Sequence, residues 1–419
     1  MRQSIGKLPS VGWVMVALAA LAQNCALGLN FASYGTLIAA MEVRFDTSRA
    51  LASSGLGAMV LSMSLCSPLV GGLLQRYSVR SVMIVGALLS AAGYALLPFV
   101  DSIYLVLAVF ALLIGPGACF LGIVPAATLV GNWFIKDRGK ALGVINMPIL
   151  LFLMPPVFGY LLITLGLNGV FLTISALFLA STLFLFLVID RPEDVGRAPR
   201  MADAGLGSAT ADAAAPLDKR ALLRKPAFWL VSIGVGVLTS GSTMLVTHFV
   251  PFGTGRGFEL NQAALLVSAF GGAGMFGALL FGWLVDRIGA VNTLIVNALA
   301  QGLLWMGLIP HSGLPAMLML AASAGACAGA IVAIHGAALN ELFGRASFSQ
   351  AMGLSYLFKL PFIVFAAPLA GWLFDRTGTY QWPIIIHILA FALSALIFLR
   401  LAVAGRGATA QNAIKGASS

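Results

Sequence analysis

Long apolar stretches alternate with short polar breaks along nearly the whole chain. Each stretch is close to the ~20 residues that an α-helix needs to cross the ~30 Å hydrocarbon layer of a bilayer. We count twelve such stretches, at residues 11–40, 51–74, 80–100, 103–130, 140–165, 169–189, 227–252, 262–284, 291–309, 314–340, 351–374 and 381–402. The pattern therefore predicts an all-α membrane protein with twelve transmembrane helices.

The polar breaks carry a repeated sequence skeleton, in which Gly-x-Leu is followed five positions later by Gly or Ser. It occurs after the second, fifth, eighth and eleventh stretches, at Gly71–Ser78, Gly159–Gly166, Gly282–Gly289 and Gly371–Gly378. The first and third copies are 211 residues apart, and the second and fourth are 212 apart. A repeat at this distance indicates a duplicated six-helix unit.

The duplication predicts two pseudo-symmetric six-helix bundles, an N-terminal one over residues 1–190 and a C-terminal one over residues 226–402. Residues 191–225 form the one long polar stretch between apolar segments, and we expect a cytoplasmic linker loop there. Residues 403–419 follow the last apolar stretch and are expected to form a cytoplasmic tail.

The net charge of +10 would suit a nucleic-acid-binding protein, but the chain is 60% hydrophobic and only 9% charged. With the N-terminus inside, 19 of the 24 basic residues fall in cytoplasmic segments, four fall outside and Lys359 lies within a span. This is the distribution that the positive-inside rule describes. The charge therefore indicates orientation in a bilayer and no nucleic-acid partner. We expect a multi-pass protein of the bacterial inner membrane with both termini in the cytoplasm.

The chain carries no pattern typical of an enzyme or a metal site. Its four cysteines lie inside apolar stretches, without the spacing of metal ligands or of a disulfide framework. The linker region lacks a glycine-rich phosphate-binding loop. We therefore expect no catalytic activity, no cofactor and no metal.

Two six-helix halves with glycine motifs after spans 2 and 8 resemble the major facilitator superfamily, whose motif reads G-x-L-x-D-R-x-G. The copy at Gly282–Gly289 matches, whereas the copy at Gly71–Ser78 has Gln75 in place of the acid. The resemblance implies that charges at the inner helix ends pair with a neighbouring helix and release it as the halves rock. Simple anchoring at the membrane surface is the alternative. The residues to which this gating role falls are Gly71, Arg76, Gly282, Asp286 and Arg287.

Two further stretches resemble a narrower branch of that superfamily. Trp133–Gly143 looks like the signature that enters span 5 of monocarboxylate transporters and of their bacterial oxalate/formate antiporter relatives. Gly353–Phe362 looks like the start of span 11 in those antiporters, where a lysine binds the carboxylate substrate, and Lys359 falls on that lysine. Ala278 stands where the branch tends to carry an arginine in span 8. This departure argues against a doubly charged substrate such as oxalate, so the resemblance implies an anion-binding lysine and no particular substrate.

Lys359 is the charged residue that the pattern places deep within a span. It lies about nine residues into its helix, which is ~13 Å at 1.5 Å per residue. An unpaired cation at such depth costs ~2.5 kcal/mol or more. All fourteen acidic residues fall in loops or at span ends, so we predict that the partner of Lys359 is the substrate, a small organic anion. The alternative is a neutral lysine, or one bonded to helix carbonyls, that serves packing.

Span 1 adds a polar face to the candidate substrate site. Gln23, Asn30 and Tyr34 are spaced seven and four residues apart, as one face of a helix requires, and Asn24 is adjacent. Span 1 lines the central cavity in the superfamily that this chain resembles, and span 5 contributes Asn146. We predict that these residues bind the substrate, with hydrogen bonding between helices as the open alternative.

His335 in span 10 is the remaining candidate. An imidazole titrates near neutral pH, so His335 could link proton movement to transport, whereas a structural hydrogen bond is the plainer role. No acidic residue is expected within a span. Proton coupling would therefore need Lys359, His335 or the substrate itself.

Together these features predict a monomeric secondary active transporter that moves a small, monocarboxylate-like organic anion by alternating access between its halves. Proton symport and anion exchange both fit, so the expected partners are the anion, protons and the lipid bilayer. Two other functions stay open: an efflux carrier for amphipathic compounds, and a membrane sensor that binds its ligand without transporting it.

Overall fold

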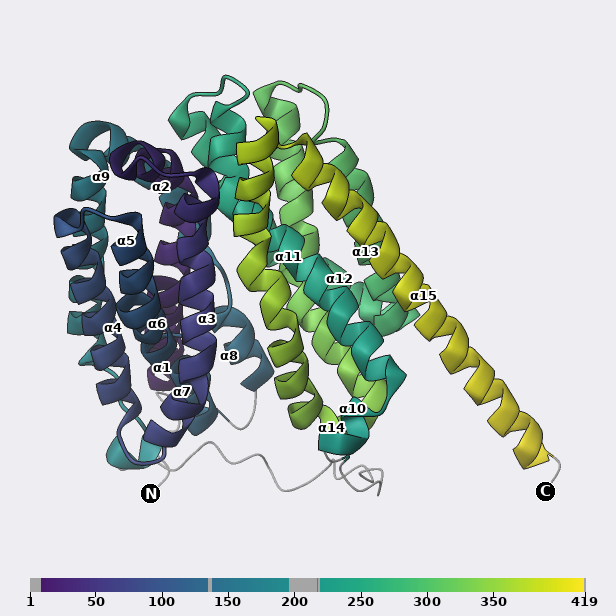
Figure 1. Ribbon diagram of the computed structural model, residues 1–419. Helices are drawn as coiled ribbons and strands as arrows, with labels where there is room; N and C mark the ends of the chain where they lie inside the picture. Colours follow the sequence, from purple (N-terminus) through teal and green to yellow (C-terminus); the bar gives the residue numbers. More distant parts are fainter. Residues whose placement is uncertain (1–8, 135–137, 196–216, 218, 418–419) are drawn as a thin grey trace. The chain divides into compact units, whose positions relative to one another are not determined.

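The structure, a computed structural model, describes residues 9–134, 138–195, 217 and 219–417. Every regular element in these ranges is a helix (Figure 1). Ten helices there are long and apolar enough to cross a membrane. One of them, Lys140–Leu185, contains two of the predicted spans, and the shorter apolar helix Ala290–Met306 is another. The all-α fold with twelve spans is therefore confirmed.

The chain divides into two compact units, which we call the N-terminal unit and the C-terminal unit. The first consists of Met1–Ala209 and Glu259–Ser268, and the second of Thr210–Phe258 and Ala269–Ser419. The division after Ala209 falls inside the predicted linker, most of which lies outside the described residues.

The N-terminal unit begins with a span made of three helical segments in series. α1 (Pro9–Gln23) passes through a π-helix (Asn24–Leu29) into α2 (Asn30–Phe45). A second π-helix (Phe110–Ile114) interrupts the fourth span. The other helices of this unit are α3 (Arg49–Leu73), α4 (Val79–Leu96), α5 (Ile103–Val109), α6 (Gly115–Leu121), α7 (Ile123–Trp133), α8 (Arg138–Ile145) and α9 (Ile149–Leu185).

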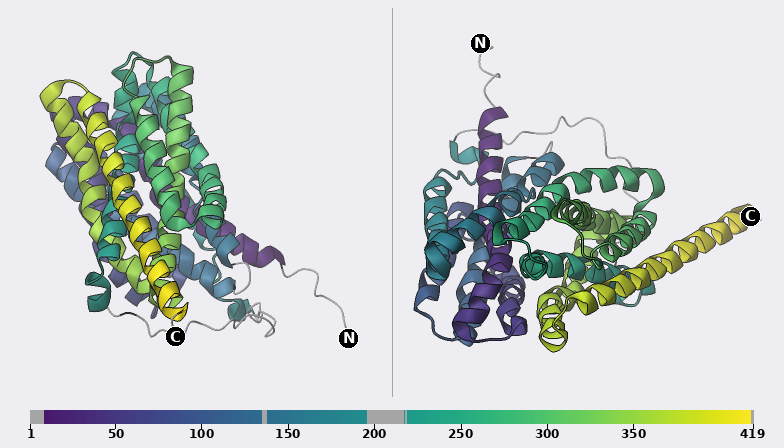
Figure 2. Two further views of the ribbon diagram at one scale, coloured as in Figure 1. Left: turned by 90° about the vertical axis from the view of Figure 1, so that its right-hand side faces the viewer. Right: turned by 90° about the horizontal axis from the view of Figure 1, so that it is seen from above.

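The C-terminal unit contains a short helix, α10, and five longer ones. α14 is 64 residues long and holds the tenth and eleventh spans. α15 runs as one helix to Ala417 (Figure 2), so the segment expected as a tail is helical up to that residue. The helices are α10 (Lys219–Leu223), α11 (Pro226–Thr254), α12 (Leu260–Ile288), α13 (Ala290–Met306), α14 (Leu314–Thr377) and α15 (Gln381–Ala417). The first part of α12, up to Ser268, is grouped with the N-terminal unit.

The repeated glycine skeleton has a backbone explanation. Its last residue is Gly166, Gly289 or Gly378 in three copies, with φ of 68°, 81° and 68°. Positive φ favours glycine because a Cβ is strained there. At Gly166 this backbone strain is the whole reason for glycine, because an added Cβ would meet no atom within 4 Å. In the first copy Ser78 has φ −65° and caps α4 by accepting a hydrogen bond from Ser81 N. The serine therefore replaces a turn residue with a helix cap.

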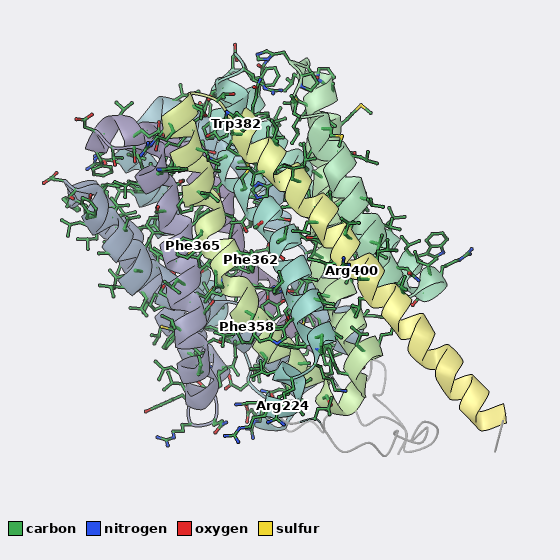
Figure 3. All side chains as sticks on the ribbon, turned by 45° about the vertical axis from the view of Figure 1, so that its right-hand side comes forward. Arg224, Phe358, Phe362, Phe365, Trp382 and Arg400 are labelled. Atoms are coloured by element: carbon green, nitrogen blue, oxygen red, sulfur yellow. The ribbon has the colours of Figure 1, made fainter. Side chains whose placement is uncertain are left out.

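Two aromatic side chains fix how the span-11 part of α14 lies against α11 (Figure 3). The Phe358 ring lies 4.5 Å from the Trp229 ring, centroid to centroid. Phe362 packs on Gly236, where an added Cβ would come within 2.8 Å of the phenyl ring. The contact therefore needs glycine at that position of α11. It sets the face that α14 turns away from α11, and with it the orientation of Lys359.

Candidate functional site

Lys359 is buried in the C-terminal unit, with 1% of its surface exposed. Its Nζ lies 3.4 Å from Nδ1 of His335 and 3.8 Å from the centroid of the Tyr356 ring. Tyr356 precedes Lys359 by three residues, which places both side chains on one helix face. His335 belongs to the span-10 part of α14 and is brought to Lys359 by the break at Gly344, where φ is 73°.

The contacts of His335 define its hydrogen-bonding state. An ammonium group only donates hydrogen bonds, so Nδ1 of His335 is the acceptor from Lys359. Nε2 lies 2.9 Å from Oγ of Ser355 and therefore carries the ring proton in a neutral imidazole. His335 has no exposed surface, so this tautomer is held inside the protein. We call Lys359, His335, Ser355 and Tyr356 the lysine cluster.

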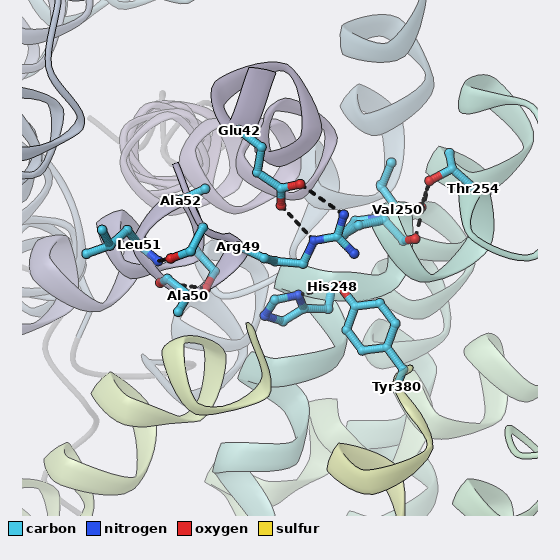
Figure 4. A network of polar contacts seen from close by, with 12 residues as sticks. Glu42, Arg49, Ala50, Leu51, Ala52, His248, Val250, Thr254 and Tyr380 are labelled. Carbon is cyan, nitrogen blue, oxygen red and sulfur yellow. Dashed lines mark hydrogen bonds and ion pairs between the residues drawn. The ribbon is translucent and has the colours of Figure 1, made fainter. Parts of the chain in front are cut away.

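No carboxylate pairs with Lys359 among the described residues. Arg49 of the N-terminal unit, in contrast, has a carboxylate partner, since it forms an ion pair with Glu42 at 2.6 Å (Figure 4). The ring of Tyr356 offsets part of the burial cost, since a desolvated cation–π contact contributes up to about 2 kcal/mol. The insertion cost of a lysine in a helix centre is about 2.5 kcal/mol or more. The lysine cluster thus supplies no negative charge that would neutralise an ammonium at Lys359.

Asn30 and Tyr34 use their polar atoms inside the N-terminal unit. Oδ1 of Asn30 accepts a hydrogen bond of 2.6 Å from the Tyr94 hydroxyl. The Tyr34 hydroxyl donates to Ala52 O at 2.7 Å and accepts from Gly55 N at 2.8 Å. These bonds join span 1 to spans 2 and 3, so the structure supports the packing alternative for this pair.

Gln23, Asn24 and Asn146 come together between spans 1 and 5. Nε2 of Gln23 donates to Oδ1 of Asn146 at 2.7 Å. The Asn24 amide donates to Met147 O and accepts from Leu150 N, both at 3.0 Å. Apart from Asn30 and Tyr34, the predicted substrate residues therefore form two groups. One is this amide cluster in the N-terminal unit, and the other is the pair Lys359 and His335 of the lysine cluster in the C-terminal unit.

The residues predicted to gate transport lie at helix ends. A Cβ added at Gly71 or at Gly282 would meet no atom within 4 Å. Arg76 and Asp286 are exposed, and the Arg287 guanidinium lies 4.6 Å from the Trp283 ring centroid. Their gating role stays a prediction.

Two carboxylates that the sequence suggested only as loop or span-end acids bind helix N-termini. Asp190 accepts from the backbone N–H of Val79 at 2.6 Å, at the start of α4. Glu341 accepts from Ala290 N at 2.8 Å, at the start of α13. A carboxylate there complements the helix dipole and satisfies an orphan N–H. In the sequence both acids follow the end of another span, 111 and 51 residues from the helix starts that they bind, so their spacing does not suggest this role.

Ser355 and Tyr356 are the functional candidates that sequence reasoning missed. They precede Lys359 by four and three residues, so helical spacing could have placed them on its face. His248 and His387 lie elsewhere: His248 bonds to Tyr380 at 2.9 Å (Figure 4), and His387 bonds to Pro383 O. Among the described residues, no group of three His, Cys, Asp or Glu converges on a possible metal position.

Twelve spans in two duplicated halves define a multi-pass membrane protein of the transporter class. A sequence model of the Major Facilitator Superfamily matches residues 19–314 and 261–417. The chain therefore belongs to the Major Facilitator Superfamily, as its glycine motifs predict.

Similar proteins include monocarboxylate transporters. Monocarboxylate transporter 12-B of Danio rerio is 27% identical over 374 residues, which cover 81% of this chain and 76% of that protein. Monocarboxylate transporter 11 of Homo sapiens is 28% identical over 387 residues, or 88% of this chain and 78% of that protein. The predicted resemblance to this branch is confirmed.

Solved structures support the fold. A bacterial homologue of the human lysosomal transporter Spinster, in an inward-facing and unoccupied conformation, matches with a TM-score of 0.68 and 13% identity. The match covers 94% of this chain and 97% of that one.

Proposed function

We propose that this protein is a secondary active transporter of a small organic anion of the monocarboxylate type. The observation that carries the proposal is Lys359, a buried cation with aromatic and imidazole neighbours and no carboxylate partner among the described residues. The similarity to monocarboxylate transporters supports the same substrate class.

The lysine cluster has the groups that a carboxylate needs. An ammonium has three N–H donors, of which His335 takes one. The Tyr356 ring covers another side of the ammonium, and the remaining donors are available to the two oxygens of a single carboxylate. A charge-assisted bond of this kind contributes about 1.5–3 kcal/mol. One lysine suits one carboxylate, as a monocarboxylate substrate requires. Ala278 agrees with this, because it stands where the related branch tends to carry a second cation in span 8.

We further propose that the anion moves together with a proton. The lone pair of His335 Nδ1 faces Lys359, and a proton placed there would set two cations side by side. That arrangement is favourable only with an anion present, so the two ligands reinforce each other's binding. Transport by His335→Gln should then lose its dependence on a pH gradient while exchange of one labelled acid for another continues. Equal pH dependence in both proteins would leave anion exchange as the mode.

The orientation proposed is that of a bacterial inner-membrane protein with both termini in the cytoplasm. The excess of basic residues on one side, 19 against four, supports it. A thiol reagent added outside intact cells should label the variant Arg256→Cys and should leave the variant Arg224→Cys unlabelled.

Counterflow of radiolabelled propanoate in proteoliposomes tests the function. Wild type should accumulate label, and Lys359→Ala should reduce the rate more than about tenfold because one charge-assisted bond is lost. Arg376→Ala is the matched control, since Arg376 also lies over an aromatic ring, that of Trp372 at 5.3 Å, but is exposed. Binding without flux would indicate a sensor, and flux of hydrophobic cations alone would indicate an efflux carrier.

A further inference from the structure

A short basic segment precedes the seventh span. α10 ends at Leu223, and α11 begins at Pro226, which is also where the candidate membrane span begins. The seven residues before this proline include four basic side chains, and all four are exposed: Lys219, Arg220, Arg224 and Lys225. None of them forms an ion pair with a carboxylate among the described residues. We call these four side chains the basic patch.

Contacts within the C-terminal unit hold the basic patch in place. Leu222 of α10 has no exposed surface, and α10 packs against both α11 and α14. Nε1 of Trp229 donates a hydrogen bond of 2.8 Å to Leu223 O. Leu217 N donates one of 2.9 Å to Oγ of Ser347 in α14. The four charges therefore lie on a fixed segment whose apolar side is turned into the protein.

The basic patch lies at the level of the lipid headgroups. Arg224 and Lys225 directly precede Pro226, the first residue of the candidate membrane span. α10 is only five residues long, or ~7.5 Å, so the other two charges also lie near this boundary. Trp229 follows in the first turn of the span, and tryptophan is enriched at membrane interfaces. The patch is thus placed where headgroups end and hydrocarbon begins.

The charge of the patch selects one kind of partner at this level. A basic cluster that directly precedes a span on its cytoplasmic side is typical of binding to anionic lipids. Exposed side chains beside a span can reach several headgroups of one leaflet at once. We propose that the basic patch binds the headgroups of anionic phospholipids in the cytoplasmic leaflet. This inference goes beyond transport and uses the orientation proposed above.

The patch is linked to the helix that carries Lys359. Trp229, which donates to the backbone of α10, lies with its ring 4.5 Å from that of Phe358, centroid to centroid. Phe228 lies 6.1 Å from the same ring, and Phe358 directly precedes Lys359 in α14. Figure 3 shows Phe358 above Arg224 in the C-terminal unit. A lipid that binds α10 only in this folded arrangement therefore also stabilises the contact between α11 and α14.

Native mass spectrometry of the purified full chain in detergent tests the binding, with phosphatidylglycerol or phosphatidylcholine added. Wild type should bind phosphatidylglycerol at least about 25-fold more tightly, since each basic residue near an anionic headgroup contributes about fivefold. Arg220→Gln/Arg224→Gln should reduce this preference by at least about fivefold. Phosphatidylglycerol should also raise the midpoint of thermal unfolding more in wild type than in this variant.

Arg80→Gln/Arg191→Gln is the matched control, because it also removes two exposed arginines from the proposed cytoplasmic side, in the N-terminal unit. It should keep the wild-type preference. Equal losses in the two variants would assign lipid binding to the net charge of that side and overturn the proposal.

Equal affinity of wild type for the two lipids also overturns the proposal, whether or not the variants fold. If Arg220→Gln/Arg224→Gln does not fold, Lys219→Gln/Lys225→Gln takes its place with the same expected loss. The measurement contains no organic anion, so its failure leaves the proposed transport standing. Failure of propanoate counterflow likewise leaves the lipid surface standing.

Discussion

The two units carry different chemistry at equivalent positions of one duplicated framework. The repeat distance of 212 residues, from Gly159 to Gly371, aligns Lys359 with Met147. Lys359 lies on continuous helix in the C-terminal unit, whereas Met147 lies in the break of span 5. One unit keeps the hydrogen-bond ladder and adds a charge. In the N-terminal unit the helical hydrogen bonds are interrupted between Ile145 and Ile149, and the nearby polar groups are neutral amides. The two units thus share their helices but differ in local backbone structure and charge.

The largest expected effect of breaking this comparison is in the N-terminal unit. Asn24→Leu removes the side-chain bonds to Met147 O and Leu150 N. Met147 O keeps its bond from Ile149 N, whereas Leu150 N loses the partner that Asn24 provides. We expect the free energy of unfolding in detergent to fall by about 1–3 kcal/mol, because one orphaned backbone N–H costs about that much. Chemical denaturation followed by tryptophan fluorescence measures this change. Asn292→Leu is the control, since the bond from the Asn292 amide to Ile288 O is exposed. A loss of equal size there would contradict a specific effect of the Asn24 bond to Leu150 N.

An opposite and smaller effect is expected in the C-terminal unit. Lys359→Met removes a buried cation and keeps a side chain of similar length. Because the charge costs about 2.5 kcal/mol and the Tyr356 ring offsets part of this, we expect the unfolding free energy to rise by about 1 kcal/mol. Thermal unfolding of the purified protein measures it, alongside the loss of propanoate binding. A mutant that is less stable than wild type would mean that Lys359 serves packing.

The smallest effect concerns the aromatic partner of that cation. Tyr356→Leu removes the ring that lies 3.8 Å from Nζ of Lys359. We expect the unfolding free energy to fall by about 0.5–1 kcal/mol, which is the contribution of a cation–π contact whose ring is partly exposed. Tyr356→Phe retains the ring and should behave as wild type in the same thermal unfolding assay. Equal destabilisation by both substitutions would assign the effect to the hydroxyl group.

Hydrophobic periodicity was sufficient for the fold, because each span needs only length and apolarity. α9 and α14 each contain two successive spans, which meet at Gly166 and at Gly344. Hydrophobic periodicity separated the two spans in both cases, because glycine and polar residues divide the apolar stretches there. Lys359 was found by the same reasoning, as a charge out of place. Its contact with His335 was not, because 24 residues and a reversal of the chain at Gly344 intervene.

The polar face of span 1 was only partly predictable for a different reason. Gln23 and Asn30 are seven residues apart, which is two turns of a regular α-helix, but the π-helix lies between them. A π-helix has a wider turn than an α-helix, so the expected common face is lost across it. Asn30 and Tyr34 lie beyond the π-helix and share a face in α2. Nothing in the apolar composition of residues 24–29 signals the wider turn.

This π-helix makes the number of residues between Asn24 and Leu29 matter as well as their identity. One residue corresponds to about 100° of rotation about a helix axis. Deleting a single residue here would swing all of α2 around and take Asn30 away from Tyr94, and Tyr34 away from Ala52. Span 1 should therefore reject any change in the residue count of this segment.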